Sequence, residues 1–195
     1  MAFAPFMSII TAVVVFLSEG WYIASIFKGK TKPSRSTFWI WTLVQGMTAA
    51  SYAASGGEYA IALSVAYAAM FLFIAILSVP YGSGRWSRFD TYACLGALVS
   101  ASVWVITQSS STALVFLLAT DLIGALPTIK KSHLCPTEEH RWAWCLTLVA
   151  IITNMFSVQH WSGADIAYSA YIFAVNAVIV MLVCRPVRKK PENTV

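Results

Sequence analysis

The distribution of Lys and Arg constrains the fold of this chain more than any other feature. All 13 occur in four clusters, which follow every second hydrophobic stretch. The alternate connections, residues 55–59, 108–112 and 160–165, contain neither residue type. The clusters are Lys28, Lys30, Lys32 and Arg35; Arg85 and Arg88; Lys130, Lys131 and Arg141; and Arg185, Arg188, Lys189 and Lys190. Because short loops rich in Lys and Arg resist translocation, the pattern predicts a multi-pass membrane protein with these clusters in the cytoplasm.

The composition agrees with a chain that lives in lipid. Hydrophobic residues make up 58% of it and charged residues only 11%, whereas a soluble domain has about 25% charged residues. The basic excess lies in loops between apolar runs rather than on one solvated face, which argues against nucleic-acid binding. The spans must be helices, because no water satisfies backbone groups in the bilayer core. The sequence therefore predicts an all-α membrane protein.

Roughly 20 mostly apolar residues are needed to cross a bilayer as a helix. By that rule we predict seven spans: 5–27, 37–54, 58–79, 91–107, 112–129, 141–159 and 165–184. The first has no basic segment before it, so we interpret it as a span and not as a cleavable signal peptide. An odd number of spans and the basic loops together place the N-terminus outside and the C-terminus inside. We expect a multi-pass protein of the plasma membrane, of the bacterial inner-membrane type.

The chain also resembles itself when it is shifted by 103 residues. Each copy reads as an apolar helix, a basic loop, a Pro, a hydroxyl residue suited to an N-cap, and a helix with Trp-x-Trp. The matched pairs include Lys28 with Lys131, Pro33 with Pro136, Ser34 with Thr137, Trp39 with Trp142 and Trp41 with Trp144. We therefore expect two parallel three-helix repeats, 1–80 and 111–185. An inverting linker helix within 81–110 would join them, and 186–195 would form a basic cytoplasmic tail.

Three helices, a linker helix and three more helices form an arrangement that resembles the SWEET transporters and the wider PQ-loop family. Nicotinamide riboside transporters share this topology. The segment from Gly124 to Lys131 looks like the Pro-Gln turn of that family, with Pro127 in place and Thr128 where Gln would stand. The first copy has Ala24 and Ser25 at the matching positions. The resemblance implies substrate binding between the repeats and a hinge at Pro127.

Two acidic residues inside predicted spans are the strongest candidates for function. Glu19 and Asp121 each precede a basic loop residue by nine positions. That distance is about 13 Å along a helix, close to half of a core about 30 Å thick. Carboxylates at such depth usually face a bundle interior or a water-filled cavity. They are interpreted as a proton- or cation-coupling site or as direct substrate ligands, the alternative being structural hydrogen bonding to a neighbouring helix.

Further polar residues lie in the middle of predicted spans and could line a binding site. They are Asn154, Asn176, Gln45, Tyr67 and Tyr171. Asn176 lies on the third helix of its repeat, where SWEET-like proteins place a sugar-contacting Asn, but its partner in the shifted copy is Phe73. The alternative for the amides is interhelical hydrogen bonding, usually worth about 0.6 kcal/mol. For the tyrosines the alternative is core packing.

The two Trp-x-Trp motifs allow two interpretations. Trp gathers at membrane interfaces with its ring at the level of the headgroups. Trp41 and Trp144 could instead form aromatic walls near the cytoplasmic end of a binding site.

Several classes of function are not expected. Residues 130–140 contain His133, Cys135 and His140, but in no recognised zinc spacing. Thr137 as a helix cap, followed by two Glu, accounts for the segment without a metal. No catalytic motif is found, so we expect neither an enzyme nor a cofactor. No Lys lies within a span, which excludes a retinal Schiff base.

Together these features predict a membrane transporter of a small polar or cationic solute, working by alternating access between the two repeats. A facilitator and a proton-coupled carrier are both compatible with the residues. The alternatives are a seven-helix receptor or sensor, and an accessory subunit without transport. Expected partners are the lipid bilayer and a small-molecule substrate, with no nucleic acid; homo-oligomerisation is left open.

Overall fold

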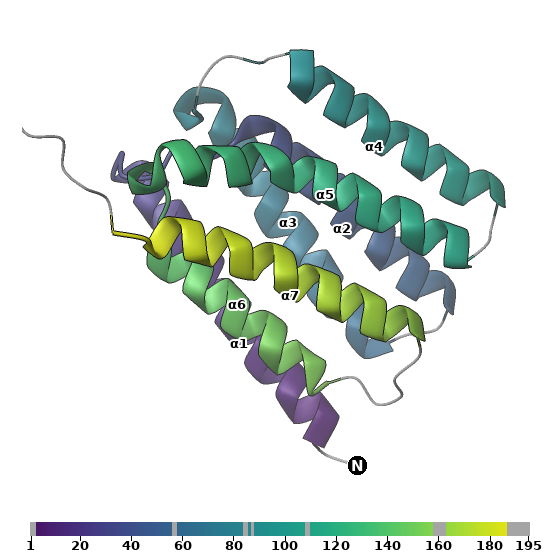
Figure 1. Cartoon of the computed structure of the whole chain (residues 1–195). Helices are drawn as coiled ribbons and strands as arrows, with labels where there is room; N and C mark the ends of the chain where they lie inside the picture. Colours follow the sequence, from purple (N-terminus) through teal and green to yellow (C-terminus); the bar gives the residue numbers. More distant parts are fainter. Residues whose placement is uncertain are drawn as a thin grey trace, which may run out of the picture.

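A computed structural model of the chain describes residues 3–55, 58–83, 86, 88–107, 110–157 and 163–186. These residues form α-helices and one short 3-10 turn, with no strand among them (Figure 1). The elements are α1 (Phe3–Phe27), α2 (Arg35–Ser55), α3 (Glu58–Tyr81), α4 (Arg88–Thr107), α5 (Ser110–Leu134), η1 (Pro136–Glu138), α6 (Arg141–Met155) and α7 (Gly163–Cys184). The expected all-α fold is confirmed for the described residues.

Three helices are long and apolar enough to cross a membrane. The qualifying segments are Pro5–Phe27 in α1, Ser64–Tyr81 in α3 and Ile166–Cys184 in α7. The remaining helices have more polar residues among their apolar ones, as the Ser, Thr and Gln of α2 illustrate. The chain is therefore a helical protein with segments suited to a bilayer.

Most helix boundaries lie within about three residues of the predicted spans, and the ends of α5 and α6 differ by more. α5 contains Pro127 and continues past residue 129. It includes Lys130 and Lys131, which were expected in a loop, and ends at Leu134. Cations in the last turn interact favourably with the negative end of the helix dipole, so the helix can extend into the basic segment. α6 ends at Met155 instead of residue 159. Residues 158–162 lie outside the described part of the chain.

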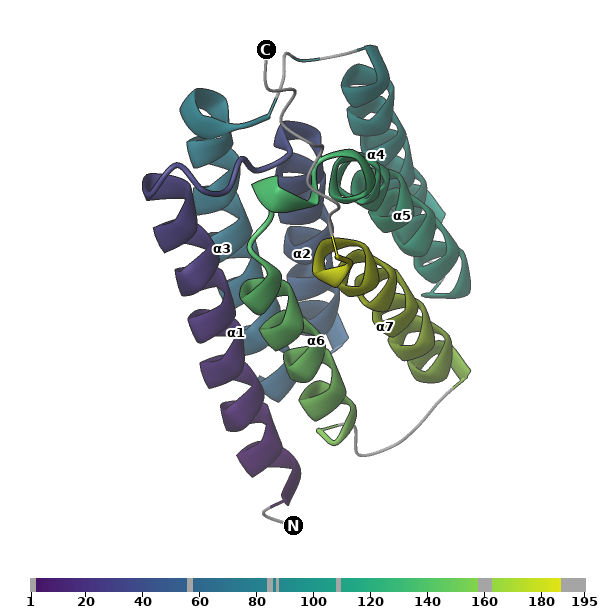
Figure 2. The same ribbon diagram turned by 60° about the vertical axis from the view of Figure 1, so that its left-hand side comes forward.

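The helices pack in a closed order around the bundle (Figure 2). α3 contacts both α1 and α2, and α7 contacts both α5 and α6. The two groups meet through α1 against α6 and through α2 against α5. α4 lies outside this ring and packs against α5 and α2. Within each group of three, the third helix thus lies between the first and the second.

The close contact of α2 with α5 depends on a glycine. A Cβ on Gly124 would lie 2.8 Å from Ile40 Cγ2. Small residues of this kind let two helices approach closely without a clash. Near the same contact the hydroxyl of Thr128 donates to Thr37 Oγ1 at 2.9 Å, and Thr37 donates to Ser34 Oγ at 3.0 Å.

All Lys and Arg residues within the described part of the chain lie at one end of the bundle, called here the basic end (Figure 2). They are Lys28, Lys30, Lys32, Arg35, Arg88, Lys130, Lys131, Arg141 and Arg185. The remaining basic residues, Arg85 and three in the tail, lie outside the described residues, as do parts of the three connections without Lys or Arg. α1 begins at the opposite end and α7 ends at the basic end.

Hydrogen bonds join the loops of the basic end to each other. The Lys32 ammonium lies 2.6 Å from a Glu138 carboxylate oxygen, which links the α1–α2 loop to η1. Arg35 donates to the carbonyls of Ser78 and Val79 at the end of α3, each at 2.9 Å. Arg185, just after α7, donates to the carbonyl of His133. The loops of both halves therefore form one connected layer.

Helix ends at this layer follow recognisable rules. α1 ends in a Schellman motif, in which the Lys30 amide donates to Ser25 O and the Gly29 amide to Ile26 O. Gly29 has φ +67°, a left-handed conformation that glycine adopts without strain. The cap expected at Thr137 is wrong: Thr137 lies inside η1, and His140 caps α6 by accepting the Ala143 amide at Nδ1, at 3.1 Å. The separate 3-10 turn shifts the start of α6 to Arg141.

Candidate functional site

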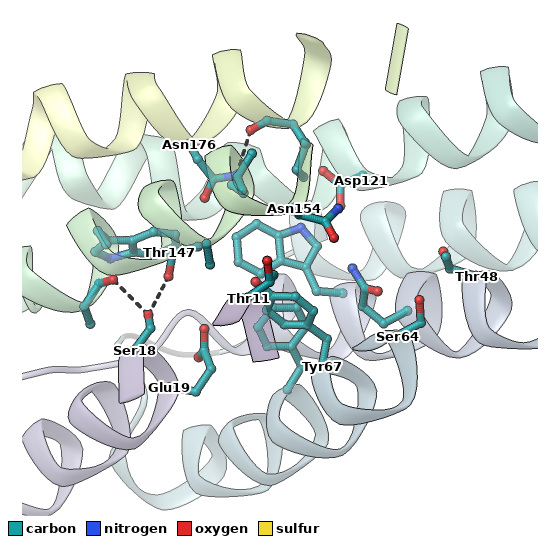
Figure 3. A pocket seen from close by; sticks show the side chains of 18 of the residues that line it. Thr11, Ser18, Glu19, Thr48, Ser64, Tyr67, Asp121, Thr147, Asn154 and Asn176 are labelled. Carbon is teal, nitrogen blue, oxygen red and sulfur yellow. Dashed lines mark hydrogen bonds between the residues drawn. The ribbon is translucent and has the colours of Figure 1, made fainter. Parts of the chain in front are cut away.

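A cavity of about 140 Å³, lined by both polar side chains and aromatic rings, lies between the two groups of three helices. Side chains from α1, α2, α3, α5, α6 and α7 line it, and no described residue of α4 does. A site of this volume has room for on the order of ten water molecules. Figure 3 shows the polar lining residues converging from both groups, among them Thr11, Ser18, Glu19, Thr48, Ser64, Asp121, Thr147, Asn154 and Asn176.

The structure brings most of the predicted site residues to this cavity. Glu19, Asp121, Asn154, Asn176, Tyr67, Gln45, Trp41 and Trp144 all line it. Tyr171 contacts it indirectly, because its hydroxyl donates to Asp121 Oδ2 at 2.8 Å. Pro127 lies inside α5 and not in the cavity wall. Its missing amide removes one helical hydrogen bond, so α5 is weakened there, but a hinge at this position stays a prediction.

Glu19 extends from α1 into the cavity and is only 5% exposed (Figure 3). Among the described residues, no side chain or backbone amide donates a hydrogen bond to its carboxylate. Its neighbour Ser18 points to α6, donating to the carbonyl of Ala143 at 2.9 Å and pairing with the Thr147 hydroxyl at 2.7 Å. Ser18 therefore fixes α1 against α6. Because Glu19 is the next residue on α1, these bonds also fix the position of Glu19 at the cavity.

Asp121 lies on α5, in the other half of the bundle, and is 6% exposed. Unlike Glu19 it has a protein partner, the hydroxyl of Tyr171 on the adjacent α7. The two acids thus face one cavity from opposite halves of the bundle, one with a donor and one without. Since the cost of burying a carboxylate falls when it is hydrogen-bonded, the two are not equivalent.

The side-chain amides of the cavity also differ in the hydrogen bonds that they form with the protein. Asn176 is buried on α7 and donates through Nδ2 to the carbonyl of Ile172 at 2.9 Å. This bond uses one of the two N–H groups of the amide, and no described residue donates to the side-chain oxygen. Gln45 on α2 and Asn154 on α6 are half-buried lining residues. The lining therefore offers hydrogen-bond acceptors and donors beside the two acids.

Each Trp-x-Trp motif sends its two rings in different directions. Trp41 and Trp144 are 6% and 5% exposed and line the cavity, with ring centroids 6.1 Å apart. Trp39 and Trp142 are 38% and 57% exposed on the outer surface. The positions of Trp41 and Trp144 agree with the aromatic walls of the second interpretation, whereas a membrane interface at Trp39 and Trp142 stays a prediction.

An aromatic layer covers the end of the cavity that faces the basic end. Its rings are Tyr22, Phe38, Trp41, Phe71 and Trp144, all buried and in mutual contact. They come from α1, α2, α3 and α6, so the layer joins both halves. Lining residues toward the opposite end, such as Thr48, Asn154 and Tyr168, are half-buried. Other lining residues on that side, Thr11 and Ser64, are buried, and Thr11 donates to Thr153 Oγ1 at 3.0 Å between α1 and α6.

Glu139 holds this layer from the basic side, and sequence reasoning missed its role. Its side chain is fully buried, 2.5 Å from the Lys131 ammonium. It also accepts from Tyr22 Oη and Trp144 Nε1, each at 3.0 Å. The residue precedes α6 and was interpreted only as part of a helix start. The one available signal was an acid beside a basic loop, and sequence alone cannot say which of several acids will be buried there.

The matching position in the first half lacks such an acid. The 103-residue shift places Ser36 where the second half has Glu139. The hydroxyl of Ser36 and Nε1 of Trp41 are both buried, and no described group bonds either atom. The aromatic layer is therefore fixed by a charged network on one side only.

No group of three or more potential metal ligands occurs among the described residues. Comparison with models of protein families, with curated proteins and with solved structures finds no match to this chain. The functional argument therefore depends on the cavity and the residues around it.

Proposed function

We propose that this protein is a multi-pass membrane transporter that moves a small polar or cationic solute by alternating access. The observation that carries the proposal is the polar cavity between α1–α3 and α5–α7, which contains both Glu19 and Asp121. Substrate sites of repeat-built carriers lie near the bilayer midplane at the interface between repeats. Ionisable residues inside membrane helices usually mark substrate or ion pathways.

All seven α-helices are spans in this proposal, with the N-terminus outside and the basic end in the cytoplasm. The one-sided Lys and Arg residues support that orientation. α2, α4, α5 and α6 are less apolar than a simple span. In α2, α5 and α6 some of the polar residues line the cavity, whereas no described residue of α4 does. Polar groups of membrane helices are tolerated when they face a bundle interior or water. Lower hydropathy in these three helices is thus expected of a carrier.

Two parallel repeats, α1–α3 and α5–α7, are part of the proposal, with α4 as the linker. The packing order supports them: exchanging α1 with α5, α2 with α6 and α3 with α7 leaves the contacts around the ring unchanged. Both groups also begin at the end opposite the basic one (Figure 2). Repeats of this kind are related by an axis along the membrane normal, whereas inverted repeats have an axis in the membrane plane. The architecture is the one expected from the resemblance to SWEET-like proteins.

The aromatic layer and Glu139 act as the closed cytoplasmic gate in this mechanism. They separate the cavity from the basic end, and in this proposal the cavity opens to the outside past the half-buried Thr48, Asn154 and Tyr168. Opening toward the cytoplasm requires the halves to rock, so that contacts of Tyr22 and Trp144 across the layer separate. The hydrogen bonds from these two residues to Glu139 would break or rearrange in that step.

The two rival functions make different demands on the cavity. An accessory subunit needs no hydrated interior, and a cavity lined by two acids and several amides argues against it. A receptor needs the cavity but not the passage of solute, so it would bind a ligand and show no flux. A facilitator and a proton-coupled carrier differ in whether uptake depends on pH.

The test has two stages. A thermal-shift screen of sugars, nucleosides and amines on the purified protein identifies a ligand. Uptake of that ligand in its radiolabelled form is then measured in proteoliposomes, with and without a pH gradient. Saturable uptake above that of empty liposomes supports a transporter, and stimulation by the gradient supports proton coupling. Binding without uptake would refute the transporter and favour a receptor.

A further inference from the structure

We propose that Glu19 binds the positively charged group of a small organic cation, beside the aromatic layer of the cavity. The inference rests on the proposed function, because it names the substrate class of the same cavity. It assigns distinct roles to the two intramembrane acids: Glu19 contacts the solute, and Asp121 is held by the protein.

The charge of the lining favours a cation. Among the described residues that line the cavity, two are carboxylic acids and none is Lys, Arg or His. A buried carboxylate without a partner is costly. The Tyr171 hydroxyl meets part of this need for Asp121. Glu19 is 5% exposed, points into the cavity and has no donor among the described residues. A cationic ligand would supply the missing partner, whereas an anionic ligand would be repelled.

Aromatic rings lie next to this carboxylate. Tyr22 follows Glu19 by three positions on α1, so the two side chains lie on the same face of the helix. The Tyr22 ring contacts Trp144 and Phe38, with centroids 6.1 and 5.4 Å away. A cation within about 6 Å of a ring face is attracted by the quadrupole of that ring. An acid at the edge of an aromatic layer is a combination that recognises organic ammonium groups.

The opposite wall provides hydrogen bonds for a polar tail. The Asn176 side chain uses one N–H within α7, so its second N–H and its oxygen are left for a ligand. Gln45 and Asn154 add amide groups from α2 and α6. An inorganic ion fits less well, because no described cluster of three or more acidic, His or Cys ligands is present to surround it. The ligand class is therefore a small organic cation with a hydrogen-bonding substituent.

The experiment compares cations with neutral molecules of the same shape. Binding to the purified, full-length protein is measured by isothermal titration calorimetry in detergent. The probes are choline against 3,3-dimethylbutan-1-ol, and benzylamine against benzyl alcohol. At least one cation should bind, and its neutral counterpart should bind roughly tenfold or more weakly, as expected for hydrogen bonds and ion pairs to a charged group. A neutral molecule that binds as tightly as its cation, or no binding by either cation, would overturn the inference.

Variants assign the interaction to one residue. Glu19→Gln should weaken cation binding roughly tenfold or more and leave binding of neutral molecules unchanged. Glu138→Gln is the matched control, because it removes the same charge from an exposed ion pair outside the cavity, and it should bind like the wild type. Glu19→Asp should restore part of the affinity, which shows that the site is folded and requires a carboxylate. Equal affinity in Glu19→Gln and wild type would contradict the assignment.

The two proposals fail in different ways. Cation binding at Glu19 without uptake in proteoliposomes would contradict the transporter proposal and support the cation site. Saturable uptake of a neutral solute, without cation binding, would contradict the cation site and support the transporter proposal.

Discussion

Glu19 and Glu139 are the same residue type, buried to nearly the same degree, in opposite surroundings. They are 5% and 6% exposed. Glu139 has an ion pair with Lys131 and accepts hydrogen bonds from Tyr22 and Trp144. Glu19 faces a cavity, and no described group donates to it. Burial alone therefore does not indicate the role of a carboxylate; the number of protein donors around it does.

The number of donors around each acid indicates whether it contributes to stability, as Glu139 does, or is available for function, as Glu19 is. A buried acid with all its partners stabilises the contact between helices. An acid left without partners in a polar cavity destabilises the empty protein and is available to a ligand. Asp121 is intermediate, with one donor in Tyr171. Removing each acid or its donor should therefore have graded effects on stability.

The largest expected loss of stability comes from Glu139→Ala. The substitution leaves Lys131 without its carboxylate and removes the acceptor of two buried donors. Breaking a buried ion pair costs about 3–5 kcal/mol. Glu138→Ala is the control, because its pair with Lys32 is more exposed and is worth about 1 kcal/mol or less. Thermal unfolding in detergent measures both, and equal melting temperatures for the two variants would contradict the network.

Tyr171→Phe should have a smaller effect. It removes the donor to Asp121 and leaves that buried carboxylate with an unmet hydrogen bond, at a cost of about 1–3 kcal/mol. Tyr67→Phe is the matched control, since Tyr67 also lines the cavity wall but has no hydrogen bond recorded for its hydroxyl among the described residues. The melting temperature should fall for the first variant and stay nearly constant for the second. An unchanged melting temperature for Tyr171→Phe would show that Asp121 does not depend on Tyr171.

Protonation of His140, the neighbour of Glu139, should destabilise the start of α6 to a smaller extent. Burial, together with the charges of Lys28, Lys30 and Arg141, holds the pKa of His140 below its ordinary value of 6.5. The neutral ring caps α6 through Nδ1. Because this folded-state pKa is lowered, the stabilisation is present above pH 6.5 and is lost as the pH falls through the lowered value.

The measurement compares melting temperatures at decreasing pH below 6.5. His140→Asn keeps a capping side chain without the titration, and a cap is worth about 1 kcal/mol. The variant should therefore lose less stability than the wild type on acidification. An identical pH dependence in both proteins would exclude His140 as the source.

The smallest effect on stability is expected for Glu19→Gln. No protein donor is lost, and an amide is less costly to bury than a carboxylate, so the melting temperature should stay the same or rise. Function should nevertheless be impaired: uptake should be lost or its pH profile changed. A fall in melting temperature comparable to that of Glu139→Ala would mean that Glu19 is structural.

Sequence reasoning located the helices and the cavity residues for physical reasons. Apolar stretches of about 20 residues and one-sided cations are strong signals, and the midspan acids at Glu19 and Asp121 are rare enough to attract attention. The features that the sequence did not predict depend on the direction of side chains and on contacts between segments far apart in the chain. Trp41 and Trp144 were selected as candidate wall residues and do line the cavity, although the Trp-x-Trp spacing alone does not give the direction of a ring. The position of Glu139 depends on η1 and on Lys131, whose helix extends further than its apolar residues indicate.

The central claim is that the cavity lies between the halves and is open from the side opposite the basic end. It is tested most directly with single cysteines in a variant whose four native cysteines are replaced by serine. Thr48→Cys lies in the cavity wall and Lys30→Cys in the basic loop. In intact cells an impermeant thiol reagent should label the first and not the second, and in inverted membrane vesicles it should label the second. Labelling of Lys30→Cys in intact cells, or a Thr48→Cys that reacts only in inverted vesicles, would contradict the account.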